Sequence, residues 1–399
     1  MMDGAVAPLL AGVTVVEISR GVAAAYAGRL LSTLGAETVL LEPPDGNPLR
    51  REPPFLPPAA EASALFAFLA AGKKSVTCDF ESPAGRAGLS TLLAAADVFI
   101  HDLRADECAR LEVDEQTVRA RYPKLIDVSV LPFGAVGPKA GWQAEEINLI
   151  HASGEGFLLP NGLAAELFPD RPPLKVYGHF AEYQGGVVAA LGALSALIGR
   201  QQGDAESVDV SVQDAALAVG AFALQRFGDG SLEHRRTRSF KYGGVLQCAD
   251  GYVELLTLEE RQWQGLIELM GRPGWMLDPV LADSLERSRR GAEINRAIRA
   301  WALEQQTADV VARAQALGVP MAKYASPAEV LSDAHERARE LFQPVEIPGG
   351  GSLPLLSAPF HVDGAALRLK AGPPRLGEHQ HLLTASRTRN QPLVAAEAS

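Results

Sequence analysis

The sequence predicts an α/β fold, in which a mostly parallel sheet carries helices on its faces and a smaller α+β domain is attached. The first half of the chain alternates short runs rich in β-branched residues with helical patterns of about a dozen residues, which is typical of βαβ units. After Val210 this alternation stops and helical patterns dominate. A chain of 399 residues has room for two or three domains.

The elements of the first half follow one another at regular intervals. Strands are expected at 14–18, 38–41, 75–80, 98–100 and 125–130, and helices at 23–34, 62–71 and 84–96. Further along, 213–227 has a helical pattern and Asp250-Gly251 is a hairpin signal before a strand at 252–256. We therefore expect a large α/β domain at 1–224, a small domain at 225–330, and a return to the large domain at 331–399 that ends in a flexible tail.

The composition is that of a soluble globular protein, with 47% hydrophobic and 21% charged residues. The 37 basic and 48 acidic residues give a net charge of −11, which argues against nucleic acid as a partner because phosphate backbones need clustered Lys and Arg. The uncharged stretch 183–199 is rich in Ala and Gly, and we expect a buried helix there rather than a membrane span.

The cysteines and histidines suggest no metal site. Three cysteines, at 78, 108 and 248, are far apart and odd in number, which indicates neither a disulfide framework nor zinc ligands and favours a reducing cytoplasm. His379 and His381 are expected to be a surface pair without function, and His151, in a helical apolar pattern, is expected in the core. The opening residues do not resemble a secretory signal.

Common active-site motifs are missing. The chain has no G-x-G-x-x-G and no G-x-S-x-G, and the run Gly72-Lys73-Lys74-Ser75 fails the phosphate-loop pattern because position 67 is Ala. The residues alone therefore indicate a soluble α/β enzyme without specifying its chemistry.

Motifs spread over nearly the whole chain indicate which chemistry the protein performs. In order they are Leu10-Ala11-Gly12-Val13, Val16-Glu17-Ile18-Ser19, Leu34-Gly35-Ala36-Glu37-Thr38-Val39, Glu42-Pro43-Pro44 with Gly46 and Arg50, Gly72-Lys73-Lys74-Ser75-Val76, Ala96-Asp97-Val98, Gly134 with Gly137-Pro138, Gly318-Val319-Pro320 and Pro373-Pro374-Arg375-Leu376-Gly377-Glu378-His379. Together they resemble the family III CoA-transferases (the CaiB/BaiF group), which also contains the α-methylacyl-CoA racemases. The resemblance implies a Rossmann-like large domain, a smaller α+β domain, an interlocked homodimer, and CoA lying across the large domain with an acyl-CoA and a carboxylic acid as substrates.

Glu182 stands where the transferases have their catalytic Asp, at the start of an Ala/Gly-rich helix that leads to Val208-Asp209-Val210-Ser211. Such a carboxylate attacks an acyl-CoA to form a mixed anhydride and then an enzyme-bound CoA thioester. The helix dipole and the N–H groups of Gly185 and Gly186 suit a carboxylate there. Glu adds a methylene, however, and a displacement of about 1 Å can cost about 100-fold in rate. Glu182 is therefore either a nucleophile in an adapted pocket or only a helix-start acid.

Two alternatives to CoA transfer stay open. The run from Glu145 to Gly154 resembles the racemase motif H-D-I-N-Y-L-A-L-S-G, with Glu145 in place of the racemase His and Glu182 in place of its Asp partner. Two carboxylates could move an α-proton between the faces of an acyl-CoA, although Glu145 could equally be an exposed helix-start acid. The second alternative is a relative that binds acyl-CoA without catalysis.

The residues that contact CoA in the family are matched only in part by this sequence. Asp102-Leu103-Arg104 and Arg110 fall on a segment that contacts CoA in the family, Lys73 or Lys74 matches its K-(R/K)-S pair, and Arg20 follows the first strand. Each cation suits a phosphate but could equally be a solvated charge. Leu40, Asp102 and Asp106 replace a cation, an Asn and a Gly of the family pattern, which weakens the expected CoA site. Arg235, Arg236 and Arg238 could compensate, recognise an acidic acceptor, or be solvated.

Overall fold

The computed structural model describes residues 7–57, 62–159, 164, 167–200, 205–220 and 242–383. The chain forms two compact units. The first comprises Met1–Glu155, Lys175–Ala221 and Asp333–Ser399, and the second comprises Gly156–Leu174 and Phe222–Ser332. The excursion of 156–174 into the second unit has no counterpart in the sequence-based division.

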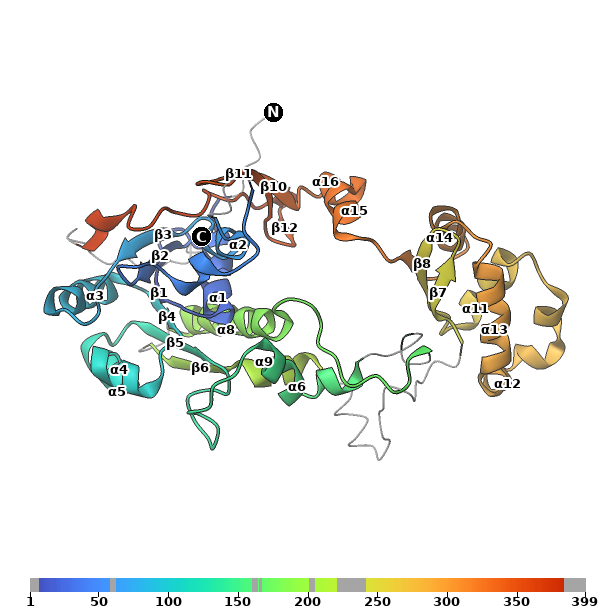
Figure 1. The fold of residues 1–399 in the computed structure, drawn as a ribbon, viewed down its shortest axis with the longest axis horizontal. Helices are drawn as coiled ribbons and strands as arrows, with labels where there is room; N and C mark the ends of the chain where they lie inside the picture. Colours follow the sequence, from blue (N-terminus) through green and yellow to red (C-terminus); the bar gives the residue numbers. More distant parts are fainter. Residues whose placement is uncertain are drawn as a thin grey trace, which may run out of the picture. The chain divides into compact units, whose positions relative to one another are not determined.

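A six-stranded parallel sheet forms the centre of the first unit, in the order β3-β2-β1-β4-β5-β6 (Figure 1). Its strands are β1 (Thr14–Ile18), β2 (Glu37–Glu42), β3 (Lys74–Thr77), β4 (Val98–His101), β5 (Ile126–Leu131) and β6 (Ser207–Ser211). The five predicted strands are confirmed. Strand β6 was not predicted as one because it is an edge strand, partly exposed, whose sequence SVDVS lacks the apolar run of a central strand.

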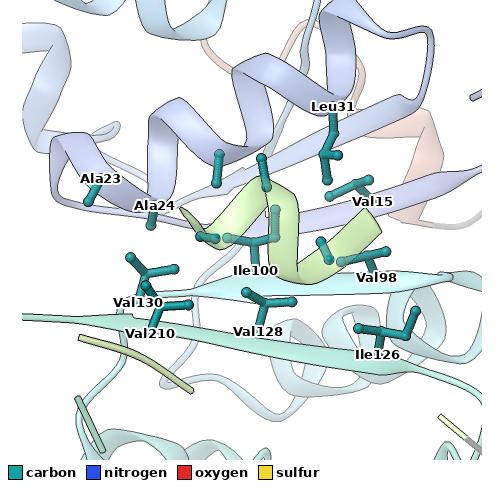
Figure 2. Packing of buried hydrophobic residues seen from close by; sticks show 14 of the residues in the cluster. Val15, Ala23, Ala24, Leu31, Val98, Ile100, Ile126, Val128, Val130 and Val210 are labelled. Atoms are coloured by element: carbon teal, nitrogen blue, oxygen red, sulfur yellow. The ribbon is translucent and has the colours of Figure 1, made fainter. Parts of the chain in front are cut away.

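Helices cover both faces of this sheet. They are α1 (Val22–Thr33), α2 (Ala64–Ala70), α3 (Pro83–Ala95), α4 (Ala105–Leu111), α5 (Glu115–Arg121), α6 (Glu146–Ala152), α8 (Phe180–Gly199) and α9 (Val212–Val219), with short 3-10 turns at η1 (Pro48–Arg51) and η2 (Glu155–Leu158). Neighbouring strand residues point to opposite faces, so Val15 packs in the same core as α1 and α8, whereas Val16 packs in the same core as α3 and α4. Figure 2 shows the first of these cores, where side chains of α1 meet those of β4 and β5.

Helix α8 packs against α1 at an unusually close approach. A methyl group added to Gly186 would lie 2.7 Å from the backbone oxygen of Ala23 and 2.9 Å from the Cβ of Tyr26. By length and composition alone α8 could cross a membrane, which is weak evidence for a span. One side of it, including Ala189 and Ala193, is buried in the core as expected. The start of α8, which carries Glu182, is therefore fixed by its contact with α1.

The C-terminal part of the chain returns to the first unit. It contains α16 (Ala334–Ala338), the hairpin β10 (Phe342–Ile347) and β11 (Gly351–Leu356), the short pair β12 (His361–Val362) and β13 (Ala365–Ala366), and η6 (Gln380–Leu383). Gln380 binds edge strand β3: its side chain accepts the Thr77 N–H at 2.9 Å and donates to the Thr77 carbonyl at 2.8 Å. His379 also joins this contact, because its Nδ1 accepts the Ser75 N–H at 3.3 Å.

The second unit has a core of its own around the buried Trp263. Three antiparallel strands, β7 (Gly244–Cys248), β8 (Gly251–Leu255) and β9 (Met321–Lys323), confirm the predicted hairpin at Asp250-Gly251. The helices are α11 (Glu260–Leu269), α12 (Ser284–Arg289), α13 (Gly291–Ala302), α14 (Thr307–Ala316) and α15 (Pro327–Ser332), with 3-10 turns η4 (Gly274–Leu277) and η5 (Pro279–Ala282).

The prediction for His151 is wrong. Its side chain is exposed in the last turn of α6, a position that suits a histidine because the helix dipole favours a positive charge there.

Candidate active site

A cavity of about 430 Å³ opens at the carboxyl ends of β1, β4 and β5. Strands β1 and β4 are neighbours, but the chain continues from β1 toward β2 on one side and from β4 toward β5 on the other. Ligands of open α/β sheets bind at such a switch point, because the loops diverge there and leave a crevice. Gly21, Asp102, Pro132, Glu145, His179 and Glu182 are among the residues that line this cavity.

Glu182 lies in the first turn of α8, with its side chain 17% exposed in the cavity. Its Oε2 is 2.7 Å from Nδ1 of His179. Its Oε1 lies toward Gly21, where an added methyl group would be 3.9 Å away. The carboxylate thus has one oxygen held by the ring of His179 and the other beside a residue with no side chain.

The side chain of Glu146, at the start of α6, binds the N-terminal end of α8. Its two carboxylate oxygens accept the backbone N–H groups of Ala181 at 3.0 Å and of Glu182 at 3.1 Å. The Glu146 side chain is buried, which raises its pKa, while the two N–H groups act in the opposite direction. Glu146 therefore supplies the capping interaction of α8 from another helix.

His179 and Glu146 were not identified from the sequence. A histidine three residues before an acid at a helix start was the available signal for His179, since such residues are neighbours on a helix. No local signal identifies Glu146, because its role depends on α6 meeting the start of α8 across 35 residues of sequence.

Arg20 and Asp102 form a second polar group at the cavity. Asp102 Oδ2 accepts the N–H of Arg20 at 2.6 Å and the N–H of Gly21 at 2.7 Å. The guanidinium of Arg20 donates to both carboxylate oxygens of Glu107, at 2.6 and 2.9 Å. Burial raises the pKa of Asp102, and the hydrogen bond to Glu107 raises the pKa of Arg20. The charge of Arg20 is thus largely compensated within the protein.

Of the other predicted site residues, Glu145 and Arg104 also line the cavity. Glu145 is exposed and precedes α6, with its backbone N–H bound by the side chain of Asn148 at 2.9 Å. Arg104 precedes α4, and its Nε lies 3.3 Å from the exposed carboxylate of Asp106. Among the described residues that line the cavity, Arg104 therefore has a more accessible positive charge than Arg20.

The structure places the remaining predicted ligands away from the lining. Leu103 is buried in the core, Arg110 lies 3.3 Å from Glu81, and Lys74 lies 3.2 Å from Glu37. Arg235, Arg236 and Arg238 lie outside the described residues.

Lys73 is buried inside the first unit. Its Nζ is 2.7 Å from Oε2 of Glu17 and donates to the Ala25 carbonyl at 2.7 Å, and only 1% of its side chain is exposed. Burial lowers the pKa of Lys73 and raises that of Glu17, while each charge favours the other. Because no donor of Lys73 is accessible to a ligand phosphate, we do not propose it as a CoA ligand.

Metal-ligating side chains do not cluster in the described part of the chain, where no three of His, Cys, Asp and Glu come together as a metal site.

Comparison with known proteins decides the family. The model of CoA-transferase family III matches residues 10–380. This chain belongs to that family. It is 27% identical over 384 residues to succinate–glutarate CoA-transferase of Agrobacterium fabrum, covering 94% of each protein. It is 28% identical to succinyl-CoA–D-citramalate CoA-transferase of Chloroflexus aurantiacus, covering 92% of this chain and 91% of the relative.

Among solved structures, a CaiB/BaiF family protein from Brucella suis matches with a TM-score of 0.81 and 27% identity, covering 94% of this chain and 97% of the other. The recognition from sequence motifs is confirmed, as is the expectation of a CoA-transferase enzyme of this family. Members of the family use CoA thioesters as substrates.

Proposed function

We propose that this family III CoA-transferase moves CoA from an acyl-CoA to a carboxylic acid with Glu182 as the nucleophile. The observation that carries the proposal is the Glu182 carboxylate itself: it opens into the cavity at the switch point of the sheet, with one oxygen bound to His179 and the other beside Gly21. A fixed carboxylate with one accessible oxygen is what nucleophilic attack requires.

The transfer proceeds through alternating anhydride and thioester intermediates, and no step takes up a proton. Glu182 Oε1 attacks the acyl carbon, the new C–O bond replaces the C–S bond, and CoA leaves as the thiolate with the electron pair. The thiolate attacks Cδ of Glu182, which releases the first carboxylate and leaves a glutamyl-CoA thioester. The acceptor carboxylate attacks that Cδ, the Cδ–S bond breaks, and CoA leaves again as the thiolate from a second anhydride. The thiolate then attacks the carbonyl carbon of the acceptor in this anhydride, which forms the new acyl-CoA and releases Glu182 as a carboxylate.

Arg104 is our candidate for contact with a CoA phosphate. Its side chain is 48% exposed and its nearest acidic partner, Asp106, is 72% exposed, so a phosphate can compete for the guanidinium. Arg20 is held by Glu107 and Asp102, and it serves better to shape the loop after β1 than to bind a new anion.

The acceptor we propose is a small carboxylic acid. Curated relatives are named for succinate and glutarate, D-citramalate, and oxalate, which are all short dicarboxylic acids. Such acids suit a cavity of about 430 Å³ that must also admit the thioester end of CoA.

Racemisation is the second candidate, because Glu145 lines the same cavity as Glu182 and an imidazole, His179, is also present. Two such groups could remove and return an α-proton. In heavy water a racemase would incorporate deuterium at the α-carbon without changing which acid carries CoA. A relative that only binds acyl-CoA would show neither deuterium incorporation nor transfer.

We also propose a homodimer and a cytoplasmic location. Val187, Leu191 and Ile198 form an apolar line on the exposed side of α8 and are 47%, 62% and 69% exposed, which suits cover by a second copy. The three cysteines are all buried free thiols, as a reducing compartment allows. Burial raises the pKa of Cys78 to about 11 and that of Cys108 to about 12, which keeps these thiols unreactive.

Hydroxylamine trapping tests the nucleophile directly. The protein is incubated with a panel of acyl-CoAs and hydroxylamine, and its peptides are then analysed by mass spectrometry. We expect a hydroxamate at Glu182 that depends on acyl-CoA, because hydroxylamine cleaves activated carboxylates. Glu182→Gln should give none, whereas Glu145→Gln, the matched control at the same cavity, should still give it. No hydroxamate with acyl-CoAs that demonstrably bind would favour the racemase or the binding protein.

A further inference from the structure

His179 and Glu182 form a hydrogen-bonded pair whose geometry departs from an ordinary helix start. His179 occupies the N-cap position of α8, and its side chain makes no capping hydrogen bond. An N-cap side chain usually accepts the N–H of the third helical residue, which here is Glu182. That N–H donates to Glu146 instead, so the His179 ring is left to bind the Glu182 carboxylate.

The hydrogen bond fixes both groups. An ionised carboxylate only accepts, so Nδ1 of His179 carries the hydrogen at 2.7 Å from Oε2. Glu has one more rotatable bond than Asp, and a carboxylate free to turn would seldom meet a thioester in the right geometry. We propose that His179 is a positioning residue that holds Oε2 and presents Oε1 to the acyl carbon, and that its protonation state sets the rate at which Glu182 is acylated.

The direction of the coupling between protonation of His179 and acylation of Glu182 follows from the charges around the His179 ring. The hydrogen bond to Glu182 is the largest cause that raises the pKa of His179 above its usual 6.5, with burial opposing it. Acylation neutralises Glu182 and so removes that cause. Acylation and loss of the His179 proton therefore favour each other. The other groups that face His179 are Glu146, Lys175 and the ring of Tyr183, with Glu145, Asp102, Arg20 and Arg104 around the same cavity.

Acylation of Glu182 is accordingly expected to rise with pH through a midpoint above about 6.5. Neutral His179 still donates through Nδ1, so positioning persists while the competing positive charge is lost. This inference rests on the proposed nucleophilic role of Glu182 and deepens it.

Three variants of His179 separate positioning from general structure. The amide nitrogen of Asn lies as many bonds from Cβ as Nδ1 does, so His179→Asn can keep the hydrogen bond, whereas the longer His179→Gln misplaces it and His179→Ala removes it. Acylation is followed by acid quench at successive times and mass spectrometry of the Glu182 peptide, from pH 6 to 9. We expect His179→Asn to acylate at close to the wild-type rate but without the pH step. We expect His179→Gln and His179→Ala to lose about 10- to 100-fold in kcat with little change in KM for acyl-CoA.

The outcomes distinguish this inference from the proposed function. A wild-type enzyme that forms no acyl-CoA-dependent adduct at Glu182 overturns the proposed function. A wild-type adduct together with an unchanged rate and unchanged pH profile in His179→Ala overturns the role of His179 alone. A pH step that persists in His179→Asn also overturns it. Thermal melts and CoA binding identify any variant that has merely unfolded. If His179→Ala or His179→Gln has unfolded, the rate and pH profile of His179→Asn test the role of His179.

Discussion

The ion pair between Lys73 and Glu17 shows how burial changes the role of a residue that a motif assigns to a ligand. The motif Gly72-Lys73-Lys74-Ser75 places two lysines next to each other, and a strand sends neighbouring side chains to opposite faces. Lys73 enters the interior, where Gly28 of α1 leaves room: a methyl group there would overlap the Glu17 carboxylate. Lys74 stays half-exposed beside Glu37.

Lys73→Met should therefore destabilise the protein by about 3–5 kcal/mol, because it leaves the buried charge of Glu17 without a cationic partner. The matched control, Lys74→Met, removes a partly exposed pair and should cost no more than about 1 kcal/mol. Urea unfolding measures both. A Lys73→Met protein of normal stability with weakened CoA affinity would contradict the structural role and favour the ligand role.

Sequence reasoning reached some residues of the site and missed others for a physical reason. Glu182 and Glu145 were identified because each stands at a helix start in a recognisable motif, and both line the cavity. His179 and Glu146 take their roles from the meeting of α6 and α8. The division between Lys73 and Lys74 likewise depends on the packing of α1 against the sheet, which no local pattern contains.

At the scale of elements, the contact between α1 and α8 determines where the proposed nucleophile, Glu182, lies. Gly186 is one turn after Glu182, and its hydrogen in place of a side chain lets the two helices touch. The central strands were predictable because strands buried on both faces are rich in Val, Ile and Leu, as β1, β2 and β5 are. Helices α4 and α5 were not predicted, since α4 buries only Cys108 and Leu111 and α5 only Val118, which leaves little apolar periodicity in their sequences.

Gly186→Ala should push α8 away from α1, because its Cβ would lie 2.7 Å from the Ala23 oxygen. We expect a loss of about 1–3 kcal/mol of stability and a lower kcat, as Glu182 shifts with its helix. Gly199→Ala is the control on the same helix: nothing lies within 4 Å of its added methyl group, and Ala favours a helix over Gly by up to about 1 kcal/mol. Equal melting temperatures and equal kcat for the two variants would refute the role of the close contact.

At the scale of the whole molecule, the apolar line on α8 is what the proposed homodimer would cover. Leu191→Asp puts a charge in the middle of that line and should shift the protein from dimer to monomer in sedimentation experiments, since burying an unpaired carboxylate is costly. Leu258→Asp, at an equally exposed apolar residue of the second unit, is the control and should leave the dimer intact. A wild-type protein that sediments as a monomer at micromolar concentration would refute the homodimer.

The contact between Gln380 and β3 has a consequence for how the protein is made. Its two partners, Thr77 and Gln380, are 303 residues apart, so a ribosome completes β3 long before the segment that binds it. Until then the outer edge of β3 offers unpaired backbone groups to other chains, and such edges invite aggregation. The nascent sheet is therefore exposed to association while the second unit is being synthesised. A holding chaperone that shields β3 in that interval should raise the yield of native enzyme.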